Sequence, residues 1–237
     1  MNRMIRMNRP HLRQSVLTLA LLATLTPLLA GCFPVAVVGV GAGALMAADR
    51  RPTETYLTDE GIEVRASVRI NEQLGDKAHV NVTSYNRSAL LTGEVFDDAA
   101  RKEIEKIVSA VPNLKSISNE TRIAGASSLA SRSNDSYITS KVKARFIDAN
   151  KFAVQHVKVV TESGTVYLLG LVTRQEADAA VEIARTTGGV QKVIRVFEVI
   201  TDTRARELDN PQPASPAPVS TSTPAAPSVP ASPSPSK

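Results

Sequence analysis

Two stretches of this 237-residue chain repeat the same order of apolar and glycine positions at an offset of 76 to 77 residues. The match is closest where Leu91-Thr92-Gly93-Glu94-Val95 corresponds to Leu168-Leu169-Gly170-Leu171-Val172, and upstream Asp59 corresponds to Asp135. Solenoid repeats have units of about 20 to 50 residues, so a unit this long is expected to fold around a core of its own. The chain is therefore expected to contain two copies of one small domain.

Each copy shows the same predicted order of secondary structure, αββαβ. In the first copy, the apolar residues of 59–74 lie four apart, as on one side of a helix. The elements predicted after this helix are strands over 78–83 and 89–96, a helix that Asp97 caps and that runs to about Val111, and a third strand over 116–123.

The second copy follows the same order, with a helix from Asp135, two strands over 157–161 and 165–172, and a second helix that ends at Gly188-Gly189. Thr173 and Glu176 have the spacing of a capping box at the start of that helix. A small three-stranded sheet with two helices on one face buries both amphipathic sets. The predicted fold class is therefore α+β, with two tandem αββαβ domains.

A glycine stands in the middle of the second predicted strand of each copy, at Gly93 and at Gly170. Glycine within a strand permits a bulge or the close approach of another part of the chain. We expect a helix to pack closely over each glycine. The alternative is a position at which a ligand approaches the backbone.

The net charge of +5 arises mainly at the N-terminus. Arg3, Arg6, Arg9 and Arg13 carry four of the 28 basic charges in a segment without acidic residues, which leaves 24 Lys and Arg against 23 Asp and Glu in the rest of the chain. This balance does not favour nucleic acid as a partner. Three scattered histidines and one cysteine suit neither a zinc site nor a Cys/His nucleophile pair. The sequence therefore predicts no nucleic-acid partner, no metal, no cofactor and no enzymatic activity.

Residues 1–31 have the three-part order of a secretory signal peptide, with a basic segment followed by an apolar segment too short to span a bilayer comfortably. Leu29-Ala30-Gly31-Cys32 then resembles a bacterial lipobox, in which the cysteine sulfur takes a diacylglycerol before cleavage. Cys32 is therefore expected to be the lipidation site and the first residue of the mature protein. The alternative is a plain buried cysteine after an ordinary signal peptide.

The residue after Cys32 bears on the location of the protein. In the sorting pattern of such lipoproteins, an aspartate at this second position favours retention in the inner membrane. Phe33 stands there instead, which implies the outer membrane of a Gram-negative envelope. Residues 32–56 are then the acylated N-terminus and tether, held by acyl chains such as palmitate, with the chain facing the periplasm.

The C-terminal segment differs in composition from the middle of the chain, because nine of the 14 prolines lie between Pro211 and Pro235. A segment of Pro, Ser, Ala and Thr with little charge has no apolar surface with which to form a core. We expect residues 204–237 to be a disordered tail that adds nothing to folding. A reach through the periplasm, a contact to the cell wall and the absence of any role remain open.

Residues 57–203 resemble two BON domains, most closely over 135–142 (Asp135-Ser136-Tyr137-Ile138-Thr139-Ser140-Lys141-Val142) and 157–164. The resemblance divides the chain into a first domain over 57–124, a linker over 125–134 and a second domain over 135–203. A lipobox ahead of two such domains is similar to the dual-BON-domain lipoproteins of the Gram-negative outer membrane, the division and outer membrane stress-associated lipid-binding family. Two departures from this family are Tyr137, where its members place a tryptophan, and the proline-rich tail.

The resemblance implies phospholipid binding and envelope maintenance without catalysis. It also implies an anionic phospholipid membrane as partner, together with outer-membrane or cell-division proteins. The alternative function is a periplasmic scaffold whose BON domains bind envelope proteins or peptidoglycan.

A helical wheel at about 100° per residue separates two faces of the helix predicted over 135–149. Ile138, Val142 and Phe146 cluster on one side, whereas Tyr137 and Ile147 lie on the other. Tyrosine favours headgroup depth, and lysines attract anionic phosphates. The predicted phospholipid-binding residues are Tyr137, Lys141, Lys143, Ile147 and, just beyond the helix, Phe152.

An alternative for the same residues is that Tyr137 and Ile147 pack against the first domain while the two lysines are solvated. The equivalent helix of the first copy lacks the aromatic residue and carries a mixture of charges, so the membrane contact is assigned to the second copy. Its outward Val64 and Val68 are expected to contact the second domain.

Overall fold

The computed structural model describes residues 49–210, to which the structural statements are confined. The expected signal peptide, Cys32, most of the tether and residues 211–237 lie outside the described residues. The two repeats belong to one compact unit.

The first domain contains, in order, α3 (Thr53–Leu74), the short helix η2 (Gly75–Lys77), β1 (Ala78–Tyr85), β2 (Ser88–Val95), α4 (Asp98–Ser109), β3 (Ser116–Asn119) and β4 (Arg122–Ile123). The second contains α5 (Leu129–Ala149), η3 (Val154–His156), β5 (Lys158–Glu162), β6 (Thr165–Val172), α6 (Arg174–Arg185) and β7 (Lys192–Val199). A further helix, α7 (Asp202–Asp209), follows. Both repeats therefore have the predicted order αββαβ.

The two sheets share one topology. In each, the first two strands are antiparallel and the third is parallel to the second, giving the orders β1-β2-β3 and β5-β6-β7. The strand predicted over 116–123 is divided into β3 and β4, which both pair with β2. The division occurs because the side chain of Asn119 accepts hydrogen bonds from the backbone and hydroxyl of Thr121, at 3.2 and 2.6 Å.

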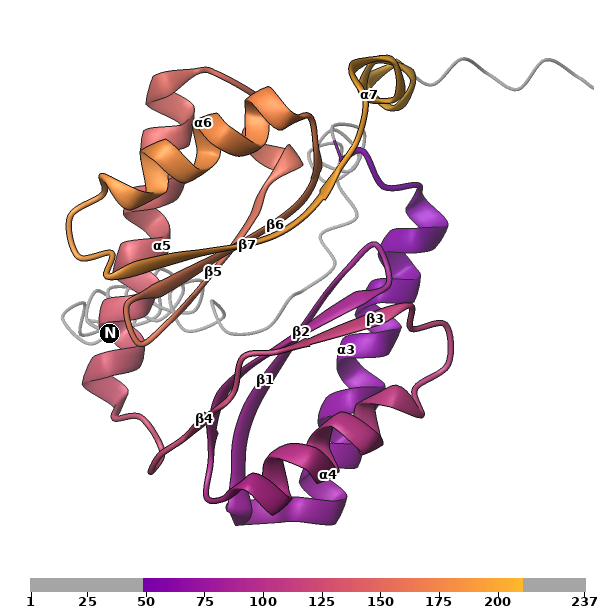
Figure 1. Ribbon diagram of the computed structural model, residues 1–237, viewed down its shortest axis with the longest axis vertical. Helices are drawn as coiled ribbons and strands as arrows, with labels where there is room; N and C mark the ends of the chain where they lie inside the picture. Colours follow the sequence, from indigo (N-terminus) through magenta and orange to yellow (C-terminus); the bar gives the residue numbers. More distant parts are fainter. Residues whose placement is uncertain (1–48, 211–237) are drawn as a thin grey trace, which may run out of the picture. The chain divides into compact units, whose positions relative to one another are not determined.

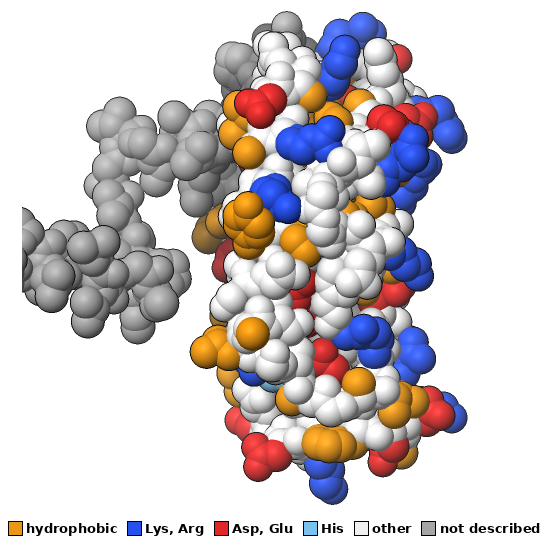
Figure 2. All heavy atoms as spheres, turned by 90° about the vertical axis from the view of Figure 1, so that its left-hand side faces the viewer, with side chains coloured by type: hydrophobic (Ala, Val, Ile, Leu, Met, Phe, Trp, Pro, Cys, Tyr) orange, Lys and Arg blue, Asp and Glu red, His pale blue; other side chains and the backbone are white. Residues whose placement is uncertain are grey.

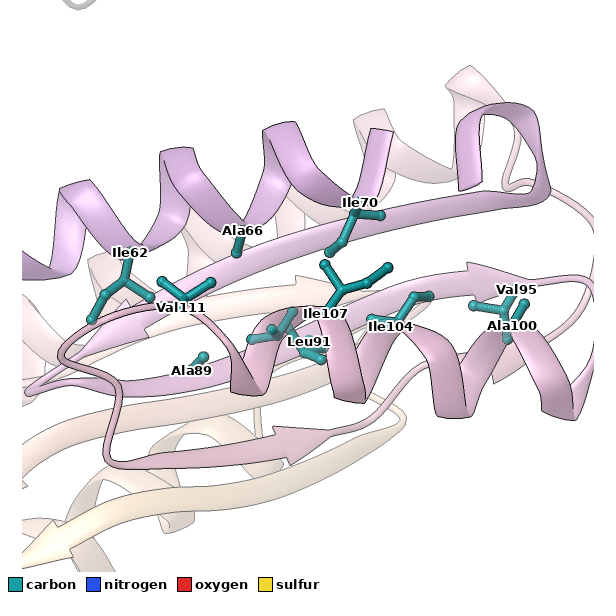
Figure 3. Packing of buried hydrophobic residues seen from close by; sticks show 11 residues of the cluster. Ile62, Ala66, Ile70, Ala89, Leu91, Val95, Ala100, Ile104, Ile107 and Val111 are labelled. Atoms are coloured by element: carbon teal, nitrogen blue, oxygen red, sulfur yellow. The ribbon is translucent and has the colours of Figure 1, made fainter. Parts of the chain in front are cut away.

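Each sheet has its two helices on one face, as Figure 1 shows for α3 with α4 and for α5 with α6. In the first domain, Ile62, Ala66 and Ile70 point from α3 toward β2 and α4, and each is at most 2% exposed (Figure 3). An equivalent cluster around Phe146 forms between α5, α6 and the second sheet. The predictions of α+β class and of a separate core for each repeat are confirmed.

The predicted caps form where the sequence places them. The Asp97 carboxylate accepts a hydrogen bond from the backbone of Ala100 at 2.7 Å at the start of α4. The capping box joins Thr173 and Glu176 at the start of α6. These side chains satisfy backbone N–H groups that lack a partner within the helix.

The opposite faces of the two sheets meet in a third buried cluster. Tyr85 and Leu90 of the first domain contact Tyr167, Leu169 and Leu171 of the second, and all five are at most 5% exposed. Polar contacts border this cluster: Lys158 Nζ lies 2.9 Å from the Glu63 carboxylate, and Asn81 donates to Glu162 at 3.1 Å. The domains therefore pack sheet against sheet.

This interface replaces the contacts expected from the helix patterns. Tyr137 and Ile147 are 62% and 63% exposed, and Val64 and Val68 are 62% and 48% exposed. The expectation that Val64 and Val68 contact the second domain is therefore wrong, as is the alternative that Tyr137 and Ile147 pack against the first. Packing the apolar faces of the two sheets against each other buries a continuous apolar surface, whereas the helix positions are separate single side chains.

The structure also corrects the expected packing over the strand glycines. A β-carbon on Gly93, whose φ is +106°, would lie 2.1 Å from the carbonyl oxygen of His79 on β1. A β-carbon on Gly170 would lie 2.3 Å from the carbonyl oxygen of His156 in η3. At both glycines, the group that leaves no room for a side chain is therefore a backbone carbonyl and not a helix. This carbonyl lies on β1 in the first domain and in η3, just before β5, in the second.

Helices extend into three segments that were expected to lie outside the two domains. The linker over 125–134 is shorter, since α5 begins at Leu129 with Ser128 as its N-cap. The tether over 32–56 ends earlier, because α3 begins at Thr53. The helix α7 extends into the segment expected as a tail from 204, with Thr201 as its N-cap and Ala205 only 4% exposed. The expectation that 204–237 adds nothing to folding is wrong for the residues in α7.

Two consecutive arginines in the expected tether are buried. Arg50 donates to Glu176 on α6 at 2.6 and 3.0 Å and to Asp209 on α7 at 2.7 and 2.9 Å. Arg51 pairs with Asp59 on α3 at 2.8 Å, and its guanidinium lies 4.0 Å from the Tyr85 ring centroid. The segment just before α3 is therefore bound to both domains.

His156 makes this arginine site sensitive to acid. Burial and the charge of Arg50 lower the pKa of His156 below its usual value of about 6.5, despite the nearby carboxylates. Because the unfolded chain then binds the proton more readily, stability is fully present above about pH 6.5 and is lost as the pH falls toward the folded-state pKa. Thermal melting at about pH 7.5 and pH 5.5 is expected to show a larger loss for the wild type than for His156→Gln. Parallel pH profiles would contradict this assignment.

Candidate functional site

The second domain fixes the orientation of α5 through its inner face. Ile138, Val142 and Phe146 are at most 1% exposed and pack on the second sheet. At the same end as Ile138, the Asp135 carboxylate accepts hydrogen bonds from the backbone of Ser163 and Gly164, each at 2.8 Å. These contacts join α5 to the turn between β5 and β6.

The first domain contains the same device at the repeated position. The Asp59 carboxylate accepts hydrogen bonds from the backbone of Asn86 and Arg87 in the turn between β1 and β2, at 2.8 and 2.7 Å. Both aspartates are at most 5% exposed. The sequence repeat aligned the two aspartates but did not indicate that they bind the turn. An aspartate at the same position of both copies, among the apolar residues of the helix, could have been the signal.

With its inner face fixed, α5 presents an outer face to solvent. Tyr137 and Ile147 are more than 60% exposed there, and Lys143 and Ala144 between them are exposed as well. Tyr137 and Ile147 are ten positions apart on the helix, or about 15 Å along the axis. We call Tyr137, Lys141, Lys143, Ala144 and Ile147 the α5 outer face.

Lys141 is held in place rather than freely solvated. Its Nζ lies 4.8 Å from the centroid of the Tyr137 ring and donates a hydrogen bond to the carbonyl of Gly188, in the loop after α6. The first contact has cation–π geometry, which orients the tyrosine ring beside the charge. Lys141 and Tyr137 therefore form one ordered amphipathic unit.

Phe152 does not join the α5 outer face. Its ring lies edge-on to the ring of Phe146, with centroids 5.0 Å apart, and the side chain is half-buried against the second core. The expected extension of the patch is therefore mostly a core contact, because the chain turns inward after Asn150.

The charge of α5 is positive overall. The helix carries Arg132, Lys141, Lys143 and Arg145 against two aspartates, of which Asp135 is buried. Figure 2, which looks onto the side of the molecule where α5 lies, shows basic and hydrophobic side chains next to one another, with acidic side chains interspersed. This surface is suited to an anionic interface.

The corresponding helix of the first domain presents different chemistry. Gly61 occupies the position that corresponds to Tyr137. Leu57, Val64 and Val68 are exposed along α3, but glutamates and arginines alternate beside them. The first domain therefore lacks an equivalent aromatic and basic surface.

Neither a membrane-spanning helix nor a metal-binding cluster occurs within residues 49–210. None of the helices in this part of the chain combines the length and the apolar character needed to span a membrane. The same residues contain no group of three His, Cys, Asp or Glu side chains placed to hold a metal ion.

Comparison with known proteins gives a consistent result. The model of the BON domain matches residues 59–125 and 134–201. The chain is similar to outer membrane lipoprotein DolP of Haemophilus influenzae, with 34% identity over 184 residues, covering 77% of this chain and 95% of that protein. It is also similar to the 21 kDa hemolysin of Actinobacillus pleuropneumoniae, with 32% identity over 154 residues, covering 64% and 79%. A more distant relative is osmotically-inducible protein Y of Escherichia coli, with 27% identity over 142 residues, covering 58% and 71%.

Proposed function

Because this chain belongs to the BON-domain family, as an outer-membrane lipoprotein with two BON domains, we propose that it binds anionic phospholipid through its second domain and thereby supports envelope integrity. In this proposal the acylated Cys32 holds the chain to the outer membrane on its periplasmic side, and α5 contacts the bilayer surface. As a member of this family the chain is a binding protein and not an enzyme.

The exposure of Tyr137 and Ile147 is the observation that carries the proposal. Both side chains are large, apolar for most of their surface and more than 60% exposed, on a helix that buries Ile138, Val142 and Phe146 on its opposite face. Tyrosine rings are stable at headgroup depth, and an isoleucine beside them would enter the acyl boundary. Lys143 and the ordered Lys141 would attract lipid phosphates at the same depth.

The expected affinity is modest. A basic residue near an anionic surface contributes about 1 kcal/mol, and this attraction falls off within a Debye length. Lys141 already donates to Gly188, so two lysines together are expected to contribute on the order of tenfold in binding. Such affinity suits a domain that a lipid anchor already keeps near a membrane.

Flotation with liposomes tests the proposal. A non-acylated chain beginning at Asp49 retains the described unit without the anchor. It is expected to float with vesicles that contain phosphatidylglycerol and to remain at the bottom of the gradient with phosphatidylcholine vesicles or at high salt. Equal flotation with both lipids, or none with either, would contradict the proposal.

The anchor is tested separately. Replacing Cys32 by alanine removes the sulfur that would take the diacylglycerol, so the variant is expected to remain unprocessed or to become soluble. Mass spectrometry of the membrane-bound wild type is expected to show an acylated N-terminal cysteine. A free thiol within an uncleaved chain would contradict the assignment.

A scaffold that binds envelope proteins or peptidoglycan is the second candidate function. The exposure of Leu57, Val64 and Val68 on α3 favours it, because these residues lie on one side of the helix without a partner among residues 49–210. This candidate would gain support if substitutions on α3 impaired envelope integrity while lipid flotation was unchanged.

A further inference from the structure

A polar groove lies between the two domains, at one border of the sheet-to-sheet interface. Its volume is about 410 Å³, within the usual range for small-molecule sites. One wall comes from α4, from the segment that joins β3 to β4 and from β4 itself, and the other comes from the first residues of β6 and β7. Neither domain alone would form it.

Strand register fixes the side chains of the second wall. Thr165 and Tyr167 on β6 lie opposite Lys192 and Ile194 on β7 in the parallel pairing. Because side chains alternate along a strand, these four point to the same face of the sheet. Lys192 and the Tyr167 hydroxyl therefore converge on the groove.

Three cations line the groove together with one carboxylate, Glu120, while a second carboxylate, Glu94, pairs with Arg122 from outside the lining. Arg101 on α4 donates to the Asn119 carbonyl at 3.2 Å, which leaves other guanidinium donors available. Arg122 spans the border, with its Nη2 3.4 Å from the buried Glu94 carboxylate and hydrogen-bonded to Ser163. Lys192 has no ion pair among residues 49–210.

The Tyr167 hydroxyl is a further donor. The side chain is 4% exposed, and it belongs to the lining of the groove. Burial, followed by the nearby Glu120 carboxylate, raises the pKa of Tyr167 to about 12, so the hydroxyl keeps its proton at neutral pH. The hydroxyl is not among the buried polar atoms that lack a partner, so it is placed to donate to a ligand in the groove.

We propose that this groove binds a phosphate ester whose polar substituent donates a hydrogen bond to Glu120. A phosphate offers more acceptor oxygens than a carboxylate does, which suits three cations together with the hydroxyl of Tyr167. Glu120 disfavours a bare anion and favours one that carries a hydroxyl or ammonium group next to the phosphate. The ester is either a phospholipid headgroup or a water-soluble compound, and its binding does not require the α5 outer face.

Calorimetric titration of the full chain in maltoside micelles tests the site. The probes are glycerol 3-phosphate, inorganic phosphate and malonate. Glycerol 3-phosphate is expected to bind at least about fivefold more tightly than inorganic phosphate, and malonate more weakly than both. No saturable binding, or equal affinity for inorganic phosphate or malonate, would overturn the proposal.

Two substitutions locate the binding. Lys192→Gln and Tyr167→Phe are each expected to weaken glycerol 3-phosphate binding about fivefold to tenfold, since each removes one donor. Arg195→Gln on the same strand is the matched control, because Arg195 lies 3.4 Å from Asp178, away from the groove, and it should leave affinity within about twofold. Thermal melting of each variant checks that the fold is retained. Wild-type affinity in both groove variants would overturn the site.

A competition identifies the source of the ester. Micelles that contain phosphatidylglycerol are expected to displace glycerol 3-phosphate from the wild-type chain if the ligand is a lipid headgroup. Retention of glycerol 3-phosphate at the same lipid concentration assigns the groove to a water-soluble ester instead. The same competition with Lys143→Gln is expected to give the wild-type result, because Lys143 lies on the α5 outer face and not in the groove lining.

Discussion

Replacing Asp59 by alanine is expected to lower the free energy of unfolding by about 3–5 kcal/mol. The carboxylate is 1% exposed and accepts hydrogen bonds from the backbone of Asn86 and Arg87 and from the Ser84 hydroxyl, at 2.7 to 2.8 Å. It also pairs with the buried Arg51. Its loss would leave these donors without an acceptor and Arg51 with one carboxylate fewer. Denaturant-induced unfolding measures the change.

The repeat supplies graded controls for this experiment. Asp135→Ala removes the same turn contacts in the second domain but no arginine partner, so a smaller loss of about 1–3 kcal/mol is expected. Glu60→Ala, on the exposed side of α3, should change stability by less than about 0.5 kcal/mol. An Asp59→Ala variant as stable as Glu60→Ala would contradict the account of the turn.

Replacing Arg50 by methionine is expected to have an effect of similar size, about 3–5 kcal/mol, because it leaves two carboxylates near each other without their cation. The Arg50 side chain is 3% exposed, and it also donates to the carbonyl of Leu171 at 2.9 Å. Without it, α7 loses the ion pair that Asp209 provides. Arg204→Met is the matched control, because Arg204 lies on α7, as Asp209 does, but forms only an exposed ion pair with Glu207.

The pH dependence of this effect has a defined sign. Hydrogen bonding from Arg50 lowers the pKa of Asp209. For Glu176, burial raises the pKa, but the hydrogen bonds from Arg50 and the Thr173 backbone, together with the charge of Arg50, lower it overall. Carboxylates with lowered pKa values stabilise the fold above their usual pKa and lose this contribution as the pH falls through the folded-state value. The difference in melting temperature between wild type and Arg50→Met should therefore be largest near pH 7 and shrink below about pH 4. A constant difference would contradict the assignment.

The sequence predicts the elements of each domain because their patterns are local. Four-residue spacing in 59–74 and alternation along the strands determine which side chains enter each core, and the caps at Asp97 and Thr173 form as their spacing indicates. Exposure of Tyr137 and Ile147 also follows from the helix wheel. These features need no information from distant parts of the chain.

Features that depend on distant partners could not be predicted in the same way. Arg50 is buried because it meets Glu176 and Asp209, which lie 126 and 159 residues away. The segment of α7 is highly charged, and only Ala205 is buried, so its pattern resembles a solvated loop. The second faces of the sheets were not assigned a partner, although Leu90 and Leu169 stand on them, because alternation does not indicate what covers a face.

Comparing lipid binding with stability for variants of α5 tests the central claim most directly. Tyr137→Ala and Ile147→Asp are each expected to reduce flotation of the non-acylated chain with phosphatidylglycerol vesicles about tenfold while leaving the melting temperature close to that of the wild type. Phe146→Asp, from the buried side of the same helix, should unfold the second domain. If the two outer variants floated as well as the wild type, or melted as early as Phe146→Asp, the assignment of lipid binding to the α5 outer face would be contradicted.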